Sequence, residues 1–333
     1  MIDLSLIWVA IIGLGVLIYV VLDGFDLGIG ILFPFVKDQQ ERDVMMNTVA
    51  PVWDGNETWM VLGGAGLFAA FPLVYSAVLS ALYLPITLMV IALIFRGVAF
   101  EFRFKANRTR YLWDQAFIWG SILSSFLQGV ILGAYIQGIE IVDHRYAGGG
   151  LDWLTPFSLF TGVGVVVVYA ALGCAWLILK TESRLQQHLY QLMPKLVMSL
   201  LVIFAGVSIY TPLAHPVIAE RWFSLPQLFY FSPVPILVLL FSVMVIRACK
   251  QQQEFLPFMY MLALVFLAYT GFLISLFPYI IPPSITIWDA AAPHQSQLFA
   301  LIGALILIPI IIGYTAMSYW VFKDKVKVGD GYH

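Results

Sequence analysis

Charged side chains are scarce in this sequence. Asp, Glu, Lys and Arg make up only 11% of its 333 residues, whereas 61% of the residues are hydrophobic. An ordinary soluble domain contains roughly 25% charged residues, so this composition excludes a typical water-soluble protein and indicates a chain that lies in lipid. The formal net charge is -2, and no block of basic residues stands apart from the short loops, so we expect no binding to nucleic acid.

Cysteine is also rare. The two cysteines, Cys174 and Cys249, form no CxxC pair, and we interpret them as small apolar residues. The sequence contains no phosphate-binding glycine loop, no metal-ligand cluster and no nucleophile triad. We therefore expect no complete active site on this chain alone.

Histidine is absent from every apolar run. A haem buried in a membrane needs axial ligands, usually His or His with Met, on helix faces. The five histidines all fall in expected loops or at the terminus: His144, His188, His215, His294 and His333. Met60, Met89 and Met261 lie inside apolar runs and are more simply core residues. The sequence therefore predicts no haem and no metal on this chain.

Apolar runs are what the sequence has in abundance. Each is near the ~20 residues that a helix needs to cross the hydrocarbon core of a bilayer. We expect nine membrane-spanning helices, near Leu6–Val36, Val49–Phe71, Val78–Phe102, Trp113–Gln137, Pro156–Leu179, Leu196–Ala214, Pro233–Ala248, Leu256–Ile281 and Leu298–Phe322. The predicted fold class is all-α, a polytopic membrane protein with a single integral membrane domain over 1–333. A polar stretch separates a first set of four helices in 1–137 from a second set in 156–322.

The basic residues alternate between successive loops. If the amino terminus faces outward, fourteen of the 17 Lys and Arg residues lie in inner loops, and only Arg145 and Arg221 lie in outer loops. Lys and Arg collect in cytoplasmic loops, so this alternation predicts a periplasmic amino terminus and a cytoplasmic carboxyl terminus. The first run lacks the basic start and the cleavage pattern of a signal peptide, so we expect it to be retained.

Two acids lie inside the first apolar run. Asp23 and Asp26 are three residues apart, which places both carboxylates on one face of a helix, and the flanking Gly24, Gly28 and Gly30 allow another helix to approach closely. Ionisable residues at this depth usually serve a function, and two neighbouring carboxylates can share one proton. The alternative is a structural role, as a helix cap or as the partner of a buried base.

The second run opens with a polar cluster. Asp54 and Glu57 are again three residues apart, Trp53 precedes them, and Asn56 can both donate and accept hydrogen bonds. A structural interpretation is also open here, because acids are favoured in the first turn of a helix.

The third run supplies a base. Arg96 needs a carboxylate or carbonyl partner at this depth, and Glu101 follows it toward the cytoplasmic side. Since the three runs are consecutive, we expect the acids Asp23, Asp26, Asp54, Glu57 and Glu101 to converge with Arg96 in a polar funnel that opens inward. Extension of Arg96 to the membrane interface is the alternative.

Four segments carry a resemblance to a known family. In order along the chain, DGFDLGIG, NTVAPVWDGNETWMVLGGAGLFAAFP, IFRGVAFEFR and FPYIIPPSITIWDAA resemble the signatures of subunit II of cytochrome bd-type ubiquinol oxidases. The length and the wording of these segments are most similar to the branch called cyanide-insensitive oxidase. The resemblance covers nearly the whole chain, and strings of this length are highly specific.

This resemblance implies a respiratory complex of the bacterial inner membrane that oxidises quinol and reduces oxygen to water. Subunit I of the family carries two b-type haems and one haem d, and subunit II resembles it in fold, with two four-helix bundles plus one extra helix, but binds no haem. Subunit I is therefore the implied partner. Small single-helix accessory subunits and a bound lipid or quinone are further partners that the resemblance allows.

The resemblance also implies a role for the acids. In the family, acids of subunit II are implicated in carrying protons from the cytoplasm toward the oxygen-reducing haem. By motif, the matching residues here are Asp26 and Asp54, with Asp23 and Glu57 as neighbours, and with Trp53, Asn56, Arg96 and Glu101 as the supporting polar cluster. Some relatives have a histidine before the Trp-Asp pair where this chain has Val52, which puts a relay through that position in doubt.

Two other functions stay open at this point. A proton-coupled secondary transporter also uses intramembrane acids and a buried arginine, although nine spans without a detectable repeat argue against it. A purely structural subunit, in which the acids stabilise contacts with a haem-bearing partner, is the other alternative.

Overall fold

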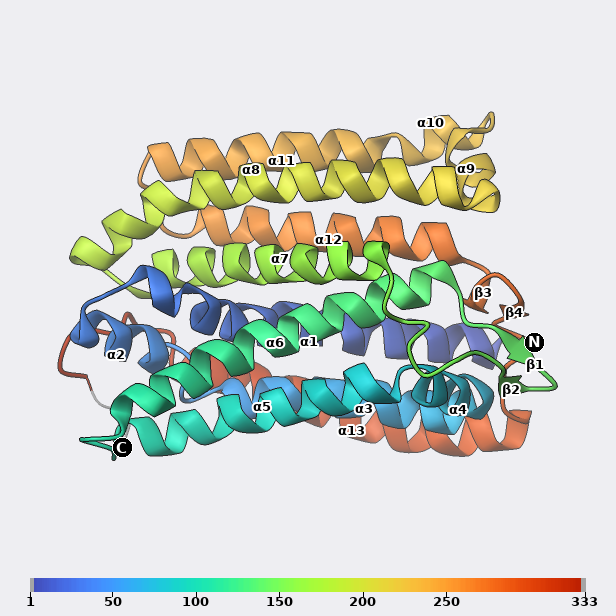
Figure 1. The fold of residues 1–333 in the computed structure, drawn as a ribbon, viewed down its shortest axis with the longest axis horizontal. Coiled ribbons are helices and arrows are strands. Elements are labelled where there is room, and N and C mark those ends of the chain that lie inside the picture. The colour runs from blue at the N-terminus through green and yellow to red at the C-terminus, as the bar shows by residue number, and fades with distance from the viewer. Residues whose placement is uncertain (1–2, 331–333) are drawn as a thin grey trace.

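Long α-helices dominate residues 3–330, the part of the chain that the computed structural model describes (Figure 1). The longer helices lie side by side along one common direction. In chain order the elements are α1 (Leu4–Leu32), η1 (Phe33–Phe35), α2 (Gln39–Asn47), α3 (Trp53–Ala70), α4 (Pro72–Ala81), α5 (Tyr83–Arg103), α6 (Arg110–Gln137), β1 (Ile141–Val142), β2 (Arg145–Tyr146), α7 (Pro156–Lys180), α8 (Ser183–Ala214), α9 (Pro216–Phe223), α10 (Gln227–Phe231), α11 (Pro233–Lys250), α12 (Leu256–Leu276), β3 (Tyr279–Ile281), β4 (Ile285–Thr286) and α13 (His294–Val321).

Within the described residues, eight helices are long and apolar enough to cross a membrane. They correspond to the expected spans except the second. That segment forms α3, which has 18 residues and packs against α1, but its polar beginning lowers its mean hydropathy. The prediction of an all-α polytopic membrane protein is confirmed.

Several expected boundaries were wrong. The second span begins at Trp53 and not at Val49, and the third is interrupted because Leu82 (φ −116°, ψ 20°) separates α4 from α5. The eighth span ends at Leu276, because Pro278 cannot continue the helix and strand β3 follows. The sixth starts at Ser183, since an amphipathic extension precedes the apolar run.

Small residues allow the central helices to pack closely. Helix α1 contacts α3, α6 and α7, while α7, α8, α11 and α12 pack around one another. A Cβ atom at Gly28 would lie 1.9 Å from the carbonyl oxygen of Tyr169, so only glycine permits this approach of α1 to α7. The division into helix sets at 1–137 and 156–322 remains a prediction.

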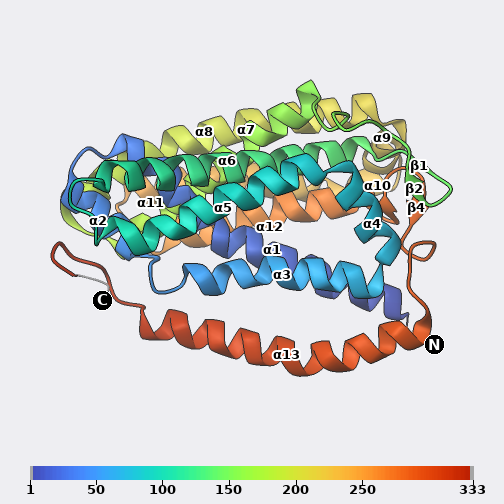
Figure 2. The same cartoon turned by 60° about the horizontal axis from the view of Figure 1, so that its bottom comes forward.

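Helix α13 lies along one edge of the molecule, next to α3 (Figure 2). It is held at both ends. At one end, Trp8 Nε1 donates a hydrogen bond to the carbonyl oxygen of Gln297 (3.1 Å). At the other end, the Lys180 ammonium donates to the carbonyl oxygen of Asp324 (2.9 Å).

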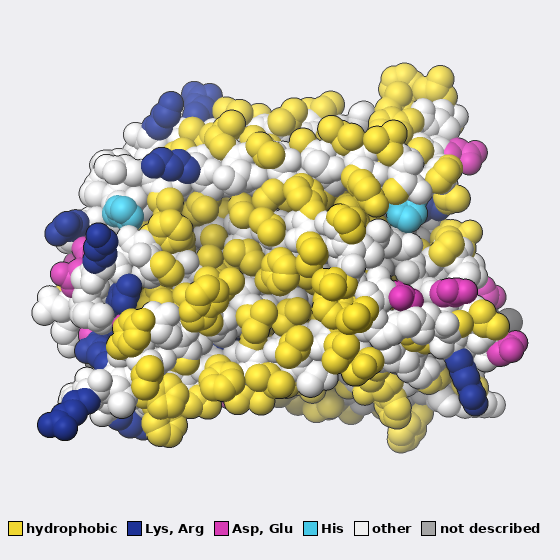
Figure 3. Space-filling view, in the orientation of Figure 1, with side chains coloured by type: hydrophobic (Ala, Val, Ile, Leu, Met, Phe, Trp, Pro, Cys, Tyr) yellow, Lys and Arg dark blue, Asp and Glu magenta, His cyan; other side chains and the backbone are white. Residues whose placement is uncertain are grey.

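The surface separates charge along the helix direction. Figure 3 shows a hydrophobic belt across the middle and Lys and Arg side chains gathered at the end where α2 lies. The two small hairpins, β1–β2 and β3–β4, lie at the opposite end with the first residues of α1. This distribution agrees with the expected orientation, but which end faces the cytoplasm remains a prediction.

Candidate functional site

The acids of α1 are completely buried. The residues Asp23 and Asp26 have 0% exposure, and they lie on one face of the helix. A buried carboxylate needs a cation or hydrogen-bond donors, because isolated charge is very unfavourable away from water. The structure supplies a different partner to each acid.

Arg96 is the partner of Asp23. Its Nη2 atom lies 2.9 Å from Asp23 Oδ1, and the same nitrogen donates a hydrogen bond to Glu57 Oε1. The Arg96 side chain is fully buried, so the alternative in which it extends to the interface is wrong. The guanidinium carbon lies 5.7 Å from the ring centroid of Trp53, whose ring is stacked on Phe100, so aromatic faces hold the charge in place.

Asn56 is the partner of Asp26. Its amide nitrogen donates a hydrogen bond to Asp26 Oδ2 (2.8 Å), and its carbonyl oxygen accepts one from the Tyr319 hydroxyl (2.9 Å). The other carboxylate oxygen, Asp26 Oδ1, is buried and has no hydrogen-bond partner among the described residues. Asp26 therefore retains an oxygen that can accept a further donor.

The other two acids expected in the funnel lie apart from this cluster. Asp54 is exposed in the first turn of α3. An acid at this position stabilises a helix, which is the structural alternative given for Asp54 above. Glu101 is exposed and pairs with Lys105, in the turn that follows α5 (3.4 Å). The structure thus brings together Asp23, Asp26, Glu57 and Arg96 but leaves Asp54 and Glu101 at the surface.

A second buried ion-pair network escaped the sequence analysis. Arg103, one of the fourteen bases expected in inner loops, is the last residue of α5. It is fully buried and pairs with Asp114 and with Asp43 (2.7 Å). Arg42 also pairs with Asp114, at 3.1 Å. This network joins α2, α5 and α6 at the basic end of the molecule. In the sequence, the acid Asp114 at the start of an apolar run was the feature that could have indicated this network.

A chain of polar side chains close to Asp23 was also missed. Tyr169 donates a hydrogen bond from its hydroxyl to Gln128 Oε1 (2.6 Å), and Gln128 Nε2 donates to the hydroxyl of Tyr19 (2.8 Å). Tyr19 lies one helical turn before Asp23 on α1. Gln128, a polar residue inside the fourth apolar run, was the signal for this chain.

The expected placement of histidine needs a correction. His188 lies in helix α8, in the amphipathic extension, and His294 is the first residue of α13, so neither is in a loop. Both are exposed. His144 lies between β1 and β2 and His215 between α8 and α9, while His333 is outside the described residues. No described histidine therefore lies in the buried interior of the helix bundle.

A cavity of about 860 Å³ opens at the hairpin end, between α1, α9 and α12. Its walls are mostly aliphatic and aromatic, and the polar side chains of Glu220 and Arg221 contribute to its lining. The Arg221 guanidinium donates a hydrogen bond to the carbonyl oxygen of Ile274 (2.9 Å), so it already has a hydrogen-bond partner within the protein.

Comparison with known proteins gives consistent matches. Residues 4–322 match the family model described as cytochrome bd terminal oxidase subunit II. The cytochrome bd-I ubiquinol oxidase subunit 2 of Escherichia coli (strain K12) is 30% identical over 371 residues, covering 98% of this chain and 96% of that protein. The cytochrome bd ubiquinol oxidase subunit 2 of Bacillus subtilis (strain 168) is 29% identical over 338 residues, with coverage of 98% and 96%.

Fold comparison agrees. A chain in the structure of bd oxidase from Geobacillus thermodenitrificans superposes with a TM-score of 0.76 at 17% identity, covering 96% of this chain and 99% of that chain. This similarity shows a shared fold. The names of these relatives do not separate the cyanide-insensitive branch from the others, so that assignment stays a prediction.

Proposed function

Because the chain belongs to the cytochrome bd terminal oxidase subunit II family, we propose that it is the haem-free second subunit of a quinol oxidase and conducts protons to its partner. The buried cluster of Asp23, Asp26, Glu57 and Arg96 is the observation that carries this proposal. Haem-bearing subunit I is the proposed partner, and its haems would reduce oxygen.

The donor set of this chain does not suit a haem. Axial ligation of the kind expected here needs His, or His with Met, directed into a buried space between helices. Among the described residues, each histidine lies in a loop, at a helix end or on an exposed helical extension. We therefore assign two b-type haems and one haem d to the partner and derive no step on this chain through them.

Charge counting supports proton uptake by the cluster. The cluster holds three carboxyl groups, those of Asp23, Asp26 and Glu57, and one guanidinium. Arg96 pairs with Asp23 and Glu57, and within residues 3–330 no base makes an ion pair with Asp26. A buried net negative charge is strongly unfavourable, so a proton taken from water stabilises the cluster. Asp26, which makes no ion pair and has an oxygen without a partner, is the proposed proton-accepting member.

Glu57 provides the proposed outlet. Its side chain is 25% exposed, although it pairs with the buried Arg96. A carboxylate in contact with lipid is unfavourable, so we place the partner subunit over this face of α3 and α5. Asp54, exposed one turn earlier on α3, lies on the proposed cytoplasmic side and collects protons or contacts the partner.

The direction of proton movement follows from the proposed topology. If the basic end faces the cytoplasm of a bacterial cell, quinol releases protons on the periplasmic side while the protons that form water enter from inside. Charge is thereby separated across the membrane without a pumping step. The chain contributes the inner half of this path.

Substitution of Asp26 in the complete oxidase tests the proposal. Asp26→Asn is expected to keep the hydrogen bond with Asn56 possible but to remove the ionisable group, so turnover should fall by about 10²-fold or more, as for other lost proton-transfer groups. Quinol-dependent oxygen consumption and proton uptake inside proteoliposomes measure it, with haem content as the check of assembly. Glu101→Gln, which changes an exposed acid outside the cluster, is the matched control.

Haem content separates conduction from a structural role. A slow Asp26→Asn complex with full haem content supports conduction, whereas loss of haem from that complex assigns the acid to assembly. Unchanged turnover with full haem content overturns the proposal. For Asp54→Asn the same two measurements apply: slower turnover with intact haem identifies a relay, and haem loss identifies a structural residue. The transporter alternative has no support from the family found here.

The cavity near α9 suits a lipid or quinone tail. Its size and apolar walls match an aliphatic chain, while the 22 lining residues include few free polar groups. Organic extraction of the purified complex, followed by quantification of quinone and lipid per chain, tests this assignment. A complex that retains neither after mild purification would argue against it.

A further inference from the structure

Helix α13 carries a polar patch in an otherwise apolar sequence. After Ser296, no hydroxyl-bearing side chain occurs until Tyr314, and then Thr315, Ser318 and Tyr319 follow within two turns. A hydroxyl group among lipid tails finds no hydrogen-bond partner outside its own helix. For Tyr319 the partner is Asn56, at the beginning of α3.

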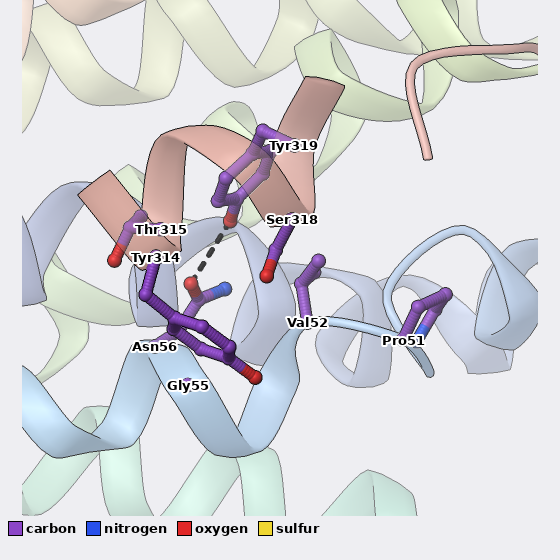
Figure 4. A pocket seen from close by; sticks show the side chains of 8 residues that line it. All are labelled: Pro51, Val52, Gly55, Asn56, Tyr314, Thr315, Ser318 and Tyr319. Atoms are coloured by element: carbon purple, nitrogen blue, oxygen red, sulfur yellow. Dashed lines mark hydrogen bonds between the residues drawn. The ribbon is translucent and has the colours of Figure 1, made fainter. Parts of the chain in front are cut away.

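A small cavity lies where α13 meets α3. Figure 4 shows the four α13 side chains on one side and, on the other, the turn that leads into α3 together with its first residues. The lining residues are Pro51, Val52, Gly55, Asn56, Tyr314, Thr315, Ser318 and Tyr319. The centre of a water molecule can move within about 10 Å³ there, which is near the volume that one bound water requires. Hydroxyl and amide groups provide the two to four polar partners that such a water needs.

One residue in the inner wall of this cavity, Asn56, is hydrogen-bonded to Asp26. The Tyr319 hydroxyl and the Asn56 amide form that wall, and the dashed line in Figure 4 marks their hydrogen bond. The Asn56 amide nitrogen then donates to Asp26 Oδ2 (2.8 Å). The rings of Phe25 and Trp176 pack against Tyr319, with centroid distances of 6.3 Å and 5.9 Å, and so fix its position.

We propose that this cavity is the hydration site from which protons reach Asp26, an inference that rests on the proposed function. Asn56 acts as a positioning residue, because an amide holds hydrogen bonds but does not readily accept and release protons. Water in the cavity is the proton carrier, and Ser318 and Tyr319 hold it. Asp26 Oδ1, buried and without a partner among the described residues, is the oxygen that accepts the proton, while Asn56 holds Asp26 Oδ2.

Filling the cavity is the direct test. A methyl group at Gly55 would lie 3.7 Å from the Tyr314 ring, an ordinary contact, so Gly55→Ala narrows the cavity without a clash. Gly64→Ala is the matched control on the same helix, because a Cβ atom at Gly64 has no atom within 4 Å. Both changes add one methyl group to α3. In the complete oxidase, we expect Gly55→Ala alone to slow proton uptake from the inner side by about threefold to tenfold, the effect of losing one water-mediated hydrogen bond.

Tyr319→Phe gives an independent measurement. This change keeps the aromatic packing but removes the hydroxyl, and we expect a similar decrease in proton uptake together with a larger solvent deuterium isotope effect on turnover. Haem content and the packing of the complex should stay unchanged. A purely structural Tyr319 would alter haem content or stability and leave the isotope effect as it was, which would overturn the inference.

The outcome separates the inference from the function beneath it. If Asp26→Asn leaves turnover intact, the proposed proton path itself fails. If Asp26→Asn slows proton uptake while Gly55→Ala and Tyr319→Phe both match the wild-type complex, the path stands but this cavity does not supply it. If Gly55→Ala prevents assembly, the Tyr319→Phe result decides alone.

Discussion

Arg96 illustrates how strongly a single buried residue depends on its partners. One guanidinium nitrogen contacts both Asp23 and Glu57, and the residue is sealed from water by Trp53 and Phe100. Breaking a buried ion pair by removing one partner typically costs about 3 to 5 kcal/mol, because the other charge stays buried and unpaired. The residue therefore stabilises helices α1, α3 and α5 against one another as well as setting the charge of the site.

Arg96→Gln is accordingly expected to reduce the amount of assembled complex sharply. The double variant Asp23→Asn/Arg96→Gln removes both charges and should recover part of that loss. The yield of haem-containing complex and its thermal unfolding temperature measure both effects. A double variant no better than Arg96→Gln would show that charge pairing is not what Arg96 contributes.

The sequence allowed some of these residues to be predicted but not their contacts. Asp23, Asp26 and Arg96 stand out because each is ionisable inside an apolar run. Tyr319 does not stand out in this way, since aromatic side chains are common near helix ends and interfaces. Its importance depends on how helices are rotated and paired, which a single sequence does not specify.

Helices α1 and α7 approach each other closely at Gly28. The methyl group of alanine at Gly28 would overlap the carbonyl oxygen of Tyr169, so the two helices would have to separate. Gly28→Ala is expected to destabilise the protein by about 1 to 3 kcal/mol, the usual cost of overpacking. Thermal unfolding in detergent measures the change, and Gly64→Ala, in open space on α3, should be neutral or slightly stabilising. Equal stability of the two variants would contradict the close packing.

The segment after α13 is tied down by a pH-sensitive contact. Lys325 lies 2.6 Å from Glu254, and its hydrogen bond lowers the pKa of that carboxyl group from its ordinary value of 4.5, with Gln186 adding to the effect. Because the folded-state pKa is below the unfolded value, the stabilisation is present above pH 4.5 and is lost as the pH falls through the folded-state pKa. The effect is small, since both side chains are partly exposed.

Hydrogen exchange detects this change locally. The Val326 N–H group donates to the carbonyl oxygen of Lys180 (3.0 Å), so its protection reports whether the segment stays docked. Protection, corrected for intrinsic rates, should be lower at about pH 4 than at about pH 6. Glu254→Gln should show the lower protection at both pH values. Unchanged protection in the wild type would mean that other contacts hold the segment.

Element boundaries were harder to predict than elements. The first part of α8 is amphipathic and so carries no hydropathy signal, although its apolar face packs in the core through Leu185 and Leu189. The break at Leu82 did have a local signal, because Pro85 lies in the first turn of α5 and its ring would clash with the carbonyl group of Ala81 in a continuous helix. Only at α8 does tertiary packing decide what local composition leaves open.

For the whole molecule, the separation of charge predicts a fixed orientation in the membrane. Both native cysteines are buried, so a single introduced cysteine reports its own location. A membrane-impermeant thiol reagent should label Glu140→Cys from outside intact cells and Lys105→Cys only after the cells are opened, because these exposed positions lie at opposite ends. The reverse pattern would invert the proposed direction of proton movement.

The tethering of α13 at both ends also has a consequence for biogenesis. Helix α1 is synthesised first and α13 last. Asn56 on α3 and Trp8 on α1 therefore lack their hydrogen-bond partners, Tyr319 and the carbonyl oxygen of Gln297, until α13 has left the ribosome. The buried acids therefore remain uncovered on this side throughout translation. A nascent chain that stalls before α13 lacks the Tyr319 hydroxyl that pairs with Asn56, so we expect unfinished copies to expose in the bilayer a polar group that finished copies bury.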